Sequence, residues 1–234
     1  MIQNILVIAA HPDDEILGCG GTMARHAGEG DSVHVLILAE GLTSRSEERN
    51  RGSHETALSE LAQTAKGANE ILGVRSCELL DFADNRMDGA DLLDVVKAVE
   101  KRIDALRPDV IYTHFPGDLN VDHRIVSQAV ATAARPVPGQ TIKEIYFFEV
   151  QSSTEWQINP SANGFLANHF VSLFPTPDSR YMSKKLEALA LYSSEMRDFP
   201  HARSVRAVEA LAALRGATIG TEAAEAFMTG RVIR

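Results

Sequence analysis

Apolar runs and segments with helical periodicity alternate along most of the chain. Residues 4–10 form an apolar run, which is typical of a strand buried on both faces of a sheet. Residues 90–106 place apolar side chains three and four positions apart, as in a helix that buries one face, and Pro108 follows. The expected strands are residues 4–10, 32–39, 77–82, 109–114, 144–150 and 169–174, and the expected helices are residues 18–26, 46–72, 90–106, 125–134, 184–194 and 204–214.

This alternation predicts an α/β fold. We expect a Rossmann-like, mostly parallel sheet with helices on both faces, followed by a helical C-terminal segment over residues 180–234. We interpret residues 1–234 as a single domain. Residues 151–179 hold Asn-rich turns and three prolines, which predicts an irregular loop region over the active site.

Composition and charge narrow the class of protein. The 234 residues are 44% hydrophobic and 24% charged, as in an ordinary soluble protein with a core. A formal net charge of −9 disfavours a nucleic acid as partner, because bulk electrostatics would repel a polyanion. Cys19 and Cys77 lack metal-ligand spacing, and the N-terminal apolar run is too short for a transmembrane segment and lacks the marks of a signal peptide. We therefore expect a cytoplasmic protein.

Four ionisable side chains follow directly after the first expected strand: His11, Asp13, Asp14 and Glu15. Unpaired buried charge is costly, so such a cluster usually binds a cation or carries out proton chemistry. The spacing of His11 and Asp14 across a proline turn suits two ligands of one divalent metal and leaves Asp13 free beside it. Glu15 is a further possible ligand, but we favour a role in bracing the turn through backbone amides.

A second polar cluster follows the expected strand 109–114 and includes Asp122 and His123. If strands 4–10 and 109–114 are neighbours, His123 faces His11 and Asp14. Two histidines and one carboxylate with open positions form a catalytic type of zinc site, in which the pKa of a bound water falls toward ~7. Asp13 would then act as general base, and Asp122 would hold the unligated nitrogen of a site histidine.

The pattern resembles the LmbE-like or PIG-L family of zinc-dependent N-deacetylases. The motifs that carry the resemblance are residues 10–15, residues 17–22, Gly30-Asp31, residues 39–41, residues 82–85 and Asp122-His123. The resemblance implies zinc ligands at His11, Asp14 and His123, a base at Asp13, and hydrolysis of an acetamide on an amino sugar such as N-acetylglucosamine. It also implies that Asp84 contacts sugar hydroxyls and that one arginine contacts the substrate; Arg45, Arg49 and Arg51 are candidates, and we favour Arg49.

One position departs from the family pattern. Many members have His-Pro-Asp-His where this chain has Asn120-Val-Asp-His. Asn120 can donate a hydrogen bond to an oxyanion but cannot transfer a proton at pH 7. Either Asp13 makes both proton transfers, or His114 or another histidine supplies the acid. Residues 118–123, Asp-Leu-Asn-Val-Asp-His, resemble a branch of the family found with polysaccharide and sugar-nucleotide enzymes, and this resemblance favours such a substrate.

Several alternatives remain open from the sequence. The substrate is alternatively a sugar-linked thiol conjugate, or the chain is a sugar-nucleotide-binding protein without turnover. The glycines at 18, 20 and 21 resemble a dinucleotide loop but lack its last glycine. Other divalent metals fit the same ligands. Trp156 and Phe165 are candidates for stacking on a sugar or for core anchors, and a homo-oligomer is possible.

Overall fold

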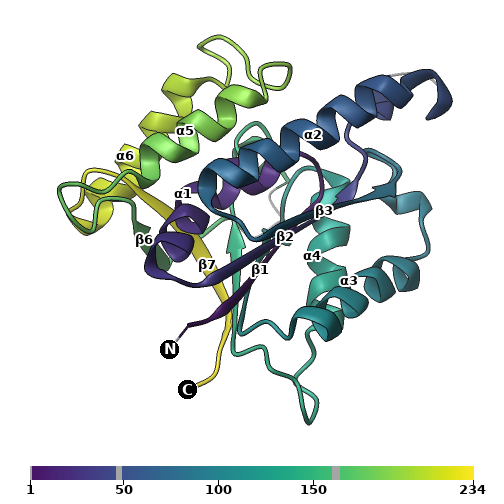
Figure 1. Cartoon of the computed structure of the whole chain (residues 1–234), viewed down its shortest axis with the longest axis horizontal. Helices are drawn as coiled ribbons and strands as arrows, with labels where there is room; N and C mark the ends of the chain where they lie inside the picture. The colour runs from purple at the N-terminus through teal and green to yellow at the C-terminus, as the bar shows by residue number, and fades with distance from the viewer. Residues whose placement is uncertain (1, 46–48, 160–163) are drawn as a thin grey trace.

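The computed structural model, which describes residues 2–45, 49–159 and 164–234, is built around one seven-stranded sheet with the strand order β3-β2-β1-β4-β5-β7-β6 (Figure 1). The strands are β1 (Asn4–Ala9), β2 (Ser32–Ala39), β3 (Ser76–Phe82), β4 (Val110–His114), β5 (Glu144–Phe148), β6 (His169–Ser172) and β7 (Ala224–Val232). The five strands from β3 to β5 are parallel, and β7 runs antiparallel to both β5 and β6. The predicted mostly parallel sheet is confirmed.

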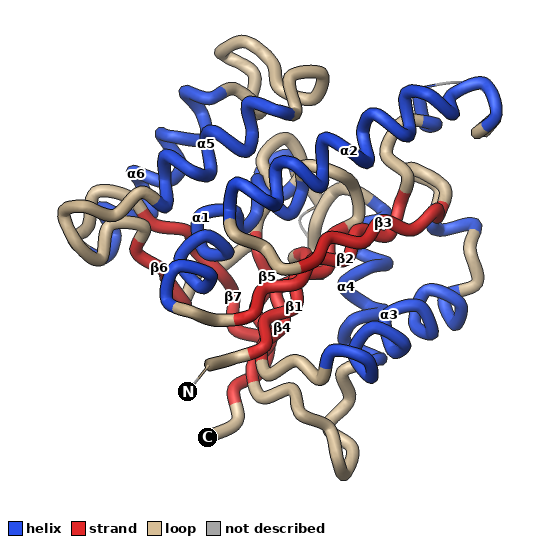
Figure 2. The backbone as a smooth tube through the Cα atoms, in the orientation of Figure 1, coloured by secondary structure: helices blue, strands red, loops and turns tan. Residues whose placement is uncertain are grey.

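Helices cover both faces of this sheet (Figure 2). They are α1 (Asp14–Glu29), α2 (Glu55–Leu72), α3 (Leu92–Leu106), α4 (Val121–Ala133), α5 (Tyr181–Leu191) and α6 (Val205–Ile219). Alternate residues of β1 point to opposite faces, as strand geometry requires. Ile5 and Val7 belong to a core with α1, α2, α5 and α6, whereas Leu6 and Ile8 belong to a core with α3 and α4. None of the helices in the described ranges is long and apolar enough to cross a membrane.

Short 3₁₀ helices mark the segments between these elements: η1 (Thr43–Arg45), η2 (Gly52–His54), η3 (Met87–Gly89) and η4 (Thr154–Trp156). The helix expected over 46–72 begins only at Glu55, and residues 46–48 lie outside the described residues. The helix expected at 125–134 begins at Val121, because the Asn120 side chain accepts the Asp122 N–H and caps it. The loop region expected over 151–179 contains η4 and β6 as well as irregular segments.

The C-terminal segment is not helical throughout, which corrects the prediction for residues 180–234. Helices α5 and α6 lie in it, but β7 follows them and inserts between β5 and β6. The start of β7 is rich in alanine, which is equally compatible with a helix. Its conformation is decided by hydrogen bonds to strands that are distant in the sequence.

Helix α1 packs closely against the sheet because small residues occupy its first half. A Cβ atom added to Gly21 would lie 2.6 Å from Leu173 Cδ1, so no larger residue fits without movement. The helix is kinked at Cys19, where φ is −150° and ψ is 26°. The N–H groups of Gly21 and Thr22 that the kink frees donate to the Glu225 carboxylate of β7, at 2.9 and 2.6 Å. These glycines therefore serve packing and not a dinucleotide loop.

The Glu225 carboxylate is paired with a buried lysine, Lys185 of α5, at 2.7 Å. Both side chains are 5% exposed. Glu225→Gln would leave the Lys185 ammonium buried without its counter-ion, so we expect a loss of about 3–5 kcal/mol in the free energy of unfolding. Urea unfolding of this variant measures the loss. The Lys185→Met/Glu225→Gln double variant should lose less than Glu225→Gln alone, and an equal or larger loss would contradict the counter-ion explanation.

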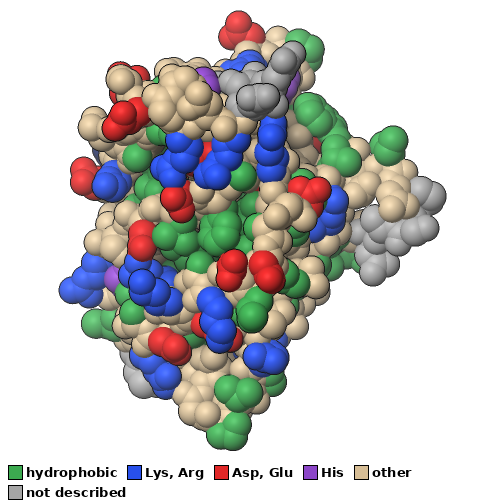
Figure 3. All heavy atoms as spheres, turned by 90° about the vertical axis from the view of Figure 1, so that its right-hand side faces the viewer, with side chains coloured by type: hydrophobic (Ala, Val, Ile, Leu, Met, Phe, Trp, Pro, Cys, Tyr) green, Lys and Arg blue, Asp and Glu red, His purple; other side chains and the backbone are tan. Residues whose placement is uncertain are grey.

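The charges on the surface are mixed where Figure 3 shows them. Lys and Arg side chains lie among Asp and Glu side chains on this face. Among the described residues seen there, the basic side chains do not form one continuous surface. This face therefore shows a mixture of both signs of charge in a chain whose formal net charge is −9.

Candidate active site

The two polar clusters predicted from the sequence meet at the carboxyl edge of the sheet. Strands β1 and β4 are parallel neighbours, with Ile8 opposite Thr113. The turn of residues 11–15 follows β1, and the segment that leads into α4 follows β4. In open α/β sheets ligands bind beyond this edge, so the topology places both clusters where a substrate site is expected.

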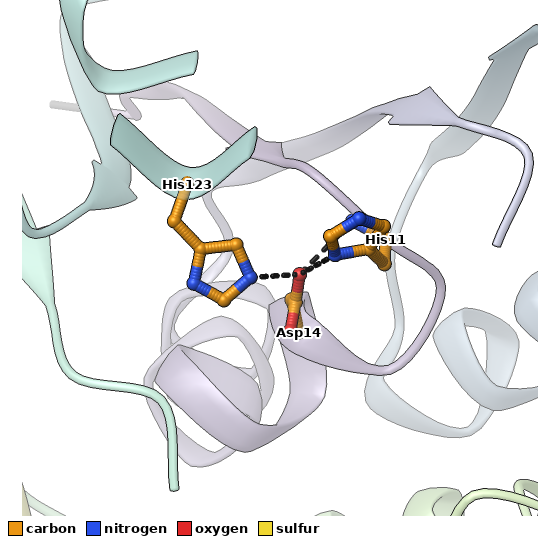
Figure 4. Close-up of side chains that lie close together, drawn as sticks. All are labelled: His11, Asp14 and His123. Atoms are coloured by element: carbon orange, nitrogen blue, oxygen red, sulfur yellow. Dashed lines mark hydrogen bonds and ion pairs between the residues drawn. The ribbon is translucent and has the colours of Figure 1, made fainter. Parts of the chain in front are cut away.

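His11, Asp14 and His123 converge on one point. Asp14 Oδ2 lies 3.1 Å from His11 Nδ1 and 3.1 Å from His123 Nε2, and Figure 4 shows the two imidazole rings on either side of the carboxylate. One ligand atom from each residue lies within 4.8 Å of the others, and all three residues are buried. The fold therefore brings His11 and His123, which are far apart in the sequence, to the same carboxylate oxygen of Asp14.

The polar atoms of this cluster fit a divalent cation. Asp14 Oδ1 is buried and lacks a hydrogen-bond partner among the described residues. Both ring nitrogens of His123 are buried and make no well-aligned hydrogen bond there, although each lies 3.1 Å from a carboxylate oxygen. Orphaned buried polar atoms are rare in folded proteins. Two imidazoles and one carboxylate are the donor set of a catalytic zinc site with open positions. His11, Asp14 and His123 are thus the residues that would hold such a metal.

A second cluster shares one of these histidines. His11 Nε2 lies 3.0 Å from Asp122 Oδ2 and 3.3 Å from Asp84 Oδ1, so these three residues also bring ligand atoms together. The oxygens of this cluster have donors: Asn85 N and Met87 N donate to Asp122. Since its acceptors are satisfied, the second cluster fits a role in orienting His11 better than a role as the main metal site.

The affinity of this cluster for a divalent metal, with zinc as the probe, should rise steeply with pH. Burial lowers the pKa of His11, but hydrogen bonds to Asp122 and Asp14 outweigh burial and raise the pKa to about 10. Below that pH the metal-free protein holds a proton on His11 that zinc must displace, so the affinity should rise about tenfold per pH unit for this proton. Calorimetric titration with zinc in buffers of different ionisation enthalpy measures the protons released. Release of none near pH 7 would contradict the prediction.

Asp118 contacts His123, the other histidine of the cluster. Its Oδ1 lies 3.1 Å from His123 Nδ1. Ser153 Oγ also donates to Oδ1, and Thr154 Oγ1 donates to Oδ2 at 2.5 Å. Burial raises the pKa of Asp118, but the close His123 ring and the hydrogen bonds from Ser153 and Thr154 outweigh it and lower the pKa to about 2. The sequence showed Asp118 among polar neighbours but contained no signal for this role.

Asp13 lies beside the metal cluster in an unusual backbone conformation. Its φ is +103°, in the left-handed region that non-glycine residues rarely adopt. Oδ1 is buried and has no hydrogen-bond partner among the described residues, whereas Oδ2 accepts from Arg203 Nη1 at 2.8 Å. Burial raises the pKa of Asp13 well above its usual value, although the Arg203 charge opposes the rise. Strained backbone and a free carboxylate oxygen are typical of a reactive group.

Glu15 points away from the cluster and holds the turn. Its Oε2 accepts the backbone N–H of Asp13 at 3.0 Å. Its Oε1 accepts from Asn69 Nδ2 at 3.0 Å and from Tyr192 OH at 2.9 Å. Burial raises the pKa of Glu15 to about 7. These contacts support the bracing role in preference to metal ligation.

The remaining predicted site residues lie near the cluster but are engaged with protein groups. Asn120 Nδ2 donates to Asn85 Oδ1 at 2.8 Å, and Asp84 Oδ2 accepts from Ser44 Oγ at 2.6 Å. Arg49 donates to both oxygens of Glu40, at 2.8 and 3.1 Å. Arg51 also pairs with Glu40, and the side chain of Arg45 lies outside the described part of the chain. A substrate contact by Arg49 would have to compete with Glu40.

His114 does not fit the role of general acid. The ring is fully buried, and its Nε2 accepts the backbone N–H of Ala10 at 2.8 Å. Burial lowers the pKa of His114 well below its usual value. The ring is enclosed by protein and stacks on His123 with 3.9 Å between ring centroids, so it packs against the cluster without reaching the solvent side.

Comparison with known proteins agrees with this geometry. The family described as PIG-L: GlcNAc-PI de-N-acetylase matches residues 6–134, more than half of the chain. The diacetylchitobiose deacetylase of Thermococcus kodakarensis is 27% identical over 233 residues, which cover 88% of this chain and 84% of that protein.

Two solved structures show the same fold. The N,N'-diacetylchitobiose deacetylase of Pyrococcus horikoshii aligns with a TM-score of 0.75 at 18% identity, over 98% of this chain and 84% of that one. The 4-carboxy-2-hydroxymuconate hydratase GalB of Pseudomonas putida aligns with a TM-score of 0.72 at 22% identity, over 100% and 99%. Since one of these proteins is a deacetylase and the other a hydratase, the fold alone does not define the chemistry. The family match covers β1 to α4 and includes both polar clusters, and by this match the chain belongs to the PIG-L family of deacetylases.

Proposed function

We propose that the protein uses one zinc ion, held by His11, Asp14 and His123, to remove an N-acetyl group from an amino sugar of the N-acetylglucosamine type. The observation that carries the proposal is the convergence of these three side chains beside Asp13 Oδ1, which no described residue hydrogen-bonds. The family match and the activity of the Thermococcus relative, a diacetylchitobiose deacetylase, support the reaction. Other divalent metals fit the same ligands.

A bound zinc ion supplies Lewis acidity, which lowers the pKa of a water molecule toward ~7. Asp13 takes the proton of the attacking water at Oδ1 and then delivers it to the departing amine. Since His114 is buried and engaged, Asp13 is the residue that serves both transfers. Asn120 keeps one Nδ2 hydrogen beyond its bond to Asn85, and this hydrogen stabilises the developing oxyanion.

Asp84 and Arg49 are proposed to contact the rest of the substrate. Asp84 is 3% exposed, and its Oδ1 lies 3.3 Å from His11 Nε2. Its Oδ2 accepts from Ser44 Oγ, so a sugar hydroxyl that donates to Oδ2 would replace Ser44 as the partner. Polysaccharide and sugar-nucleotide conjugates are the favoured substrates. A thiol-linked sugar is the alternative; Bacillus anthracis has a relative described as a probable N-acetyl-alpha-D-glucosaminyl L-malate deacetylase, which acts on another conjugate of the same sugar.

The test combines metal analysis with a screen for acetate release. Purified protein is offered diacetylchitobiose, an N-acetylglucosaminyl malate and an N-acetylated sugar nucleotide, and the products are identified by mass spectrometry. We expect about one zinc per chain, acetate release that a chelator stops, and recovery on adding zinc. An unsaturated carboxylic acid is offered in parallel, and addition of water to it without acetate release from any of the sugars would favour hydratase chemistry. Equal thermal stabilisation by a sugar nucleotide with and without chelator, in the absence of turnover, would favour a binding protein.

Two broader expectations from the sequence stay predictions: a single domain over residues 1–234 and a cytoplasmic location. The sequence also leaves open the alternatives of a monomer and a homo-oligomer. Size-exclusion chromatography with light scattering distinguishes these two alternatives. The role of residues 151–179 at the active site has partial structural support, because Ser153 and Thr154 bind Asp118.

A further inference from the structure

Arg203 connects three segments of the chain that are far apart in sequence. It lies between α5 and α6, and its Nη1 donates to Asp13 Oδ2 at 2.8 Å across 190 residues. Its Nε donates to Ser152 Oγ at 2.7 Å. The Arg203 side chain is 22% exposed and that of Asp13 is 1% exposed, so the ion pair is mostly shielded from water. Such a charge-assisted bond is stronger and more directional than one at the surface.

The contact leaves the two oxygens of Asp13 in different states. Oδ2 is bound by Arg203, whereas Oδ1 is buried with no hydrogen-bond partner in the described part of the chain. The backbone of the same residue is held by the bond from its N–H to Glu15 Oε2. With the backbone and one oxygen fixed, rotation of the carboxylate is restricted, and only Oδ1 remains available to a water molecule.

We propose that Arg203 is a positioning residue that acts through Asp13, by holding Oδ2 so that Oδ1 presents its lone pair to the proton that is transferred. This inference rests on the proposed function. An arginine suits the task because Nε and Nη1 belong to one rigid plane, which fixes Asp13 relative to Ser152. A lysine would supply the charge without the second point of attachment.

The anchor of Arg203 is itself held in a strained conformation. Ser152 has φ of +67°, in the left-handed region, and its N–H donates to Glu155 Oε1 at 2.7 Å. The next two residues, Ser153 and Thr154, bind Asp118, which holds the ligand His123. Residues 152–154 therefore locate both the proposed base and one proposed metal ligand. Strain of this kind persists where the surrounding contacts over-determine the backbone.

The test compares Arg203→Met, Arg203→Lys and Ser152→Ala with a control, Arg197→Met. Arg197 lies in the same segment but donates to the carbonyls of Ser194 and Met196. We expect Arg203→Met to lower kcat for acetate release about 10²-fold, the size of a small misplacement of a reacting group, with KM within about threefold. Arg203→Lys should recover part of the loss, and Ser152→Ala should lower kcat less than Arg203→Met. Arg197→Met should leave kcat close to that of the wild type.

Zinc affinity, measured by competition with a chelator, provides a readout that is independent of turnover. We expect the zinc affinity to change less than about threefold in Arg203→Met. Loss of a residue that contacts a metal ligand lowers metal affinity by ~10- to 100-fold, but Arg203 contacts Asp13, which is not a proposed ligand. A parallel fall in zinc affinity and kcat would assign Arg203 to the metal site and overturn the proposal. A rise in KM at unchanged kcat would assign it to substrate binding, with the same consequence.

Thermal unfolding of the metal-free protein tests the contact itself. Arg203→Met leaves Asp13 buried without its partner, so Tm should fall by about 5 °C or more, and the Asp13→Asn/Arg203→Met double variant should regain part of the loss. Additive losses would show that the two residues do not interact and would overturn the proposal. The proposed function fails separately, if the wild-type protein with zinc releases no acetate from any sugar offered.

Discussion

Asp13→Asn is expected to lower kcat for acetate release by about 10²- to 10⁴-fold while zinc stays bound. Asparagine lacks the negative charge that accepts a proton at Oδ1. It also tolerates the left-handed region better than most residues, so the turn at φ +103° should keep its shape. Steady-state kinetics, with zinc measured in the same preparations, checks both parts of the expectation.

Asp13→Ala is the second variant in this comparison. It should abolish turnover while zinc stays bound. Because an alanine at positive φ adds backbone strain, its thermal stability must be compared with that of Asp13→Asn. Loss of zinc in either variant would make Asp13 a ligand and reverse the roles given to it and to Asp14. A kcat near that of the wild type would remove Asp13 from the proton transfers.

Asp14→Asn is expected to abolish zinc binding at micromolar metal and turnover with it. Asp14 Oδ2 is the point at which His11 and His123 meet, so the variant removes the only anionic member of the proposed ligand set. The zinc affinity should fall by more than the ~10- to 100-fold that the loss of an outer partner costs. Equilibrium dialysis with zinc measures the affinity directly.

Asp84→Asn is the matched control for that experiment. It makes the same chemical change at a buried aspartate of the second cluster, which shares His11 with the first. If His11, Asp14 and His123 are the ligands, Asp84→Asn should still bind zinc. Its zinc affinity should fall by no more than the ~10- to 100-fold that the loss of an outer partner costs. If Asp84→Asn loses zinc and Asp14→Asn keeps it, the metal belongs to His11, Asp84 and Asp122.

The sequence was sufficient for the features whose signal is local. The apolar run of β1 and the four ionisable groups that follow it are adjacent in the chain, and the alternation of strands and helices predicts a parallel sheet with neighbouring carboxyl ends. From these, the meeting of His11, Asp14 and His123 could be anticipated. The apolar runs that alternate with helical segments also predicted six of the seven strands, β1 to β6.

Other features depended on contacts that no local pattern encodes. Strand β7 was missed because its pairing with β5 and β6, and not its own propensity, decides its conformation. The bracing of Asp118 by Ser153 and Thr154 and the pairing of Arg49 with Glu40 belong to the same class. Residue types alone do not tell which of many surface arginines finds which carboxylate.

The chain by itself determined the chemistry available at the end of β1, because a strand that is buried on both faces must deliver the residues that follow it to one edge of the sheet. Only the tertiary structure decided how that chemistry is oriented. Arg203 reaches Asp13 across 190 residues, and a buried ion pair at that separation forms only when α5, α6 and the segment at Ser152 have packed around the turn.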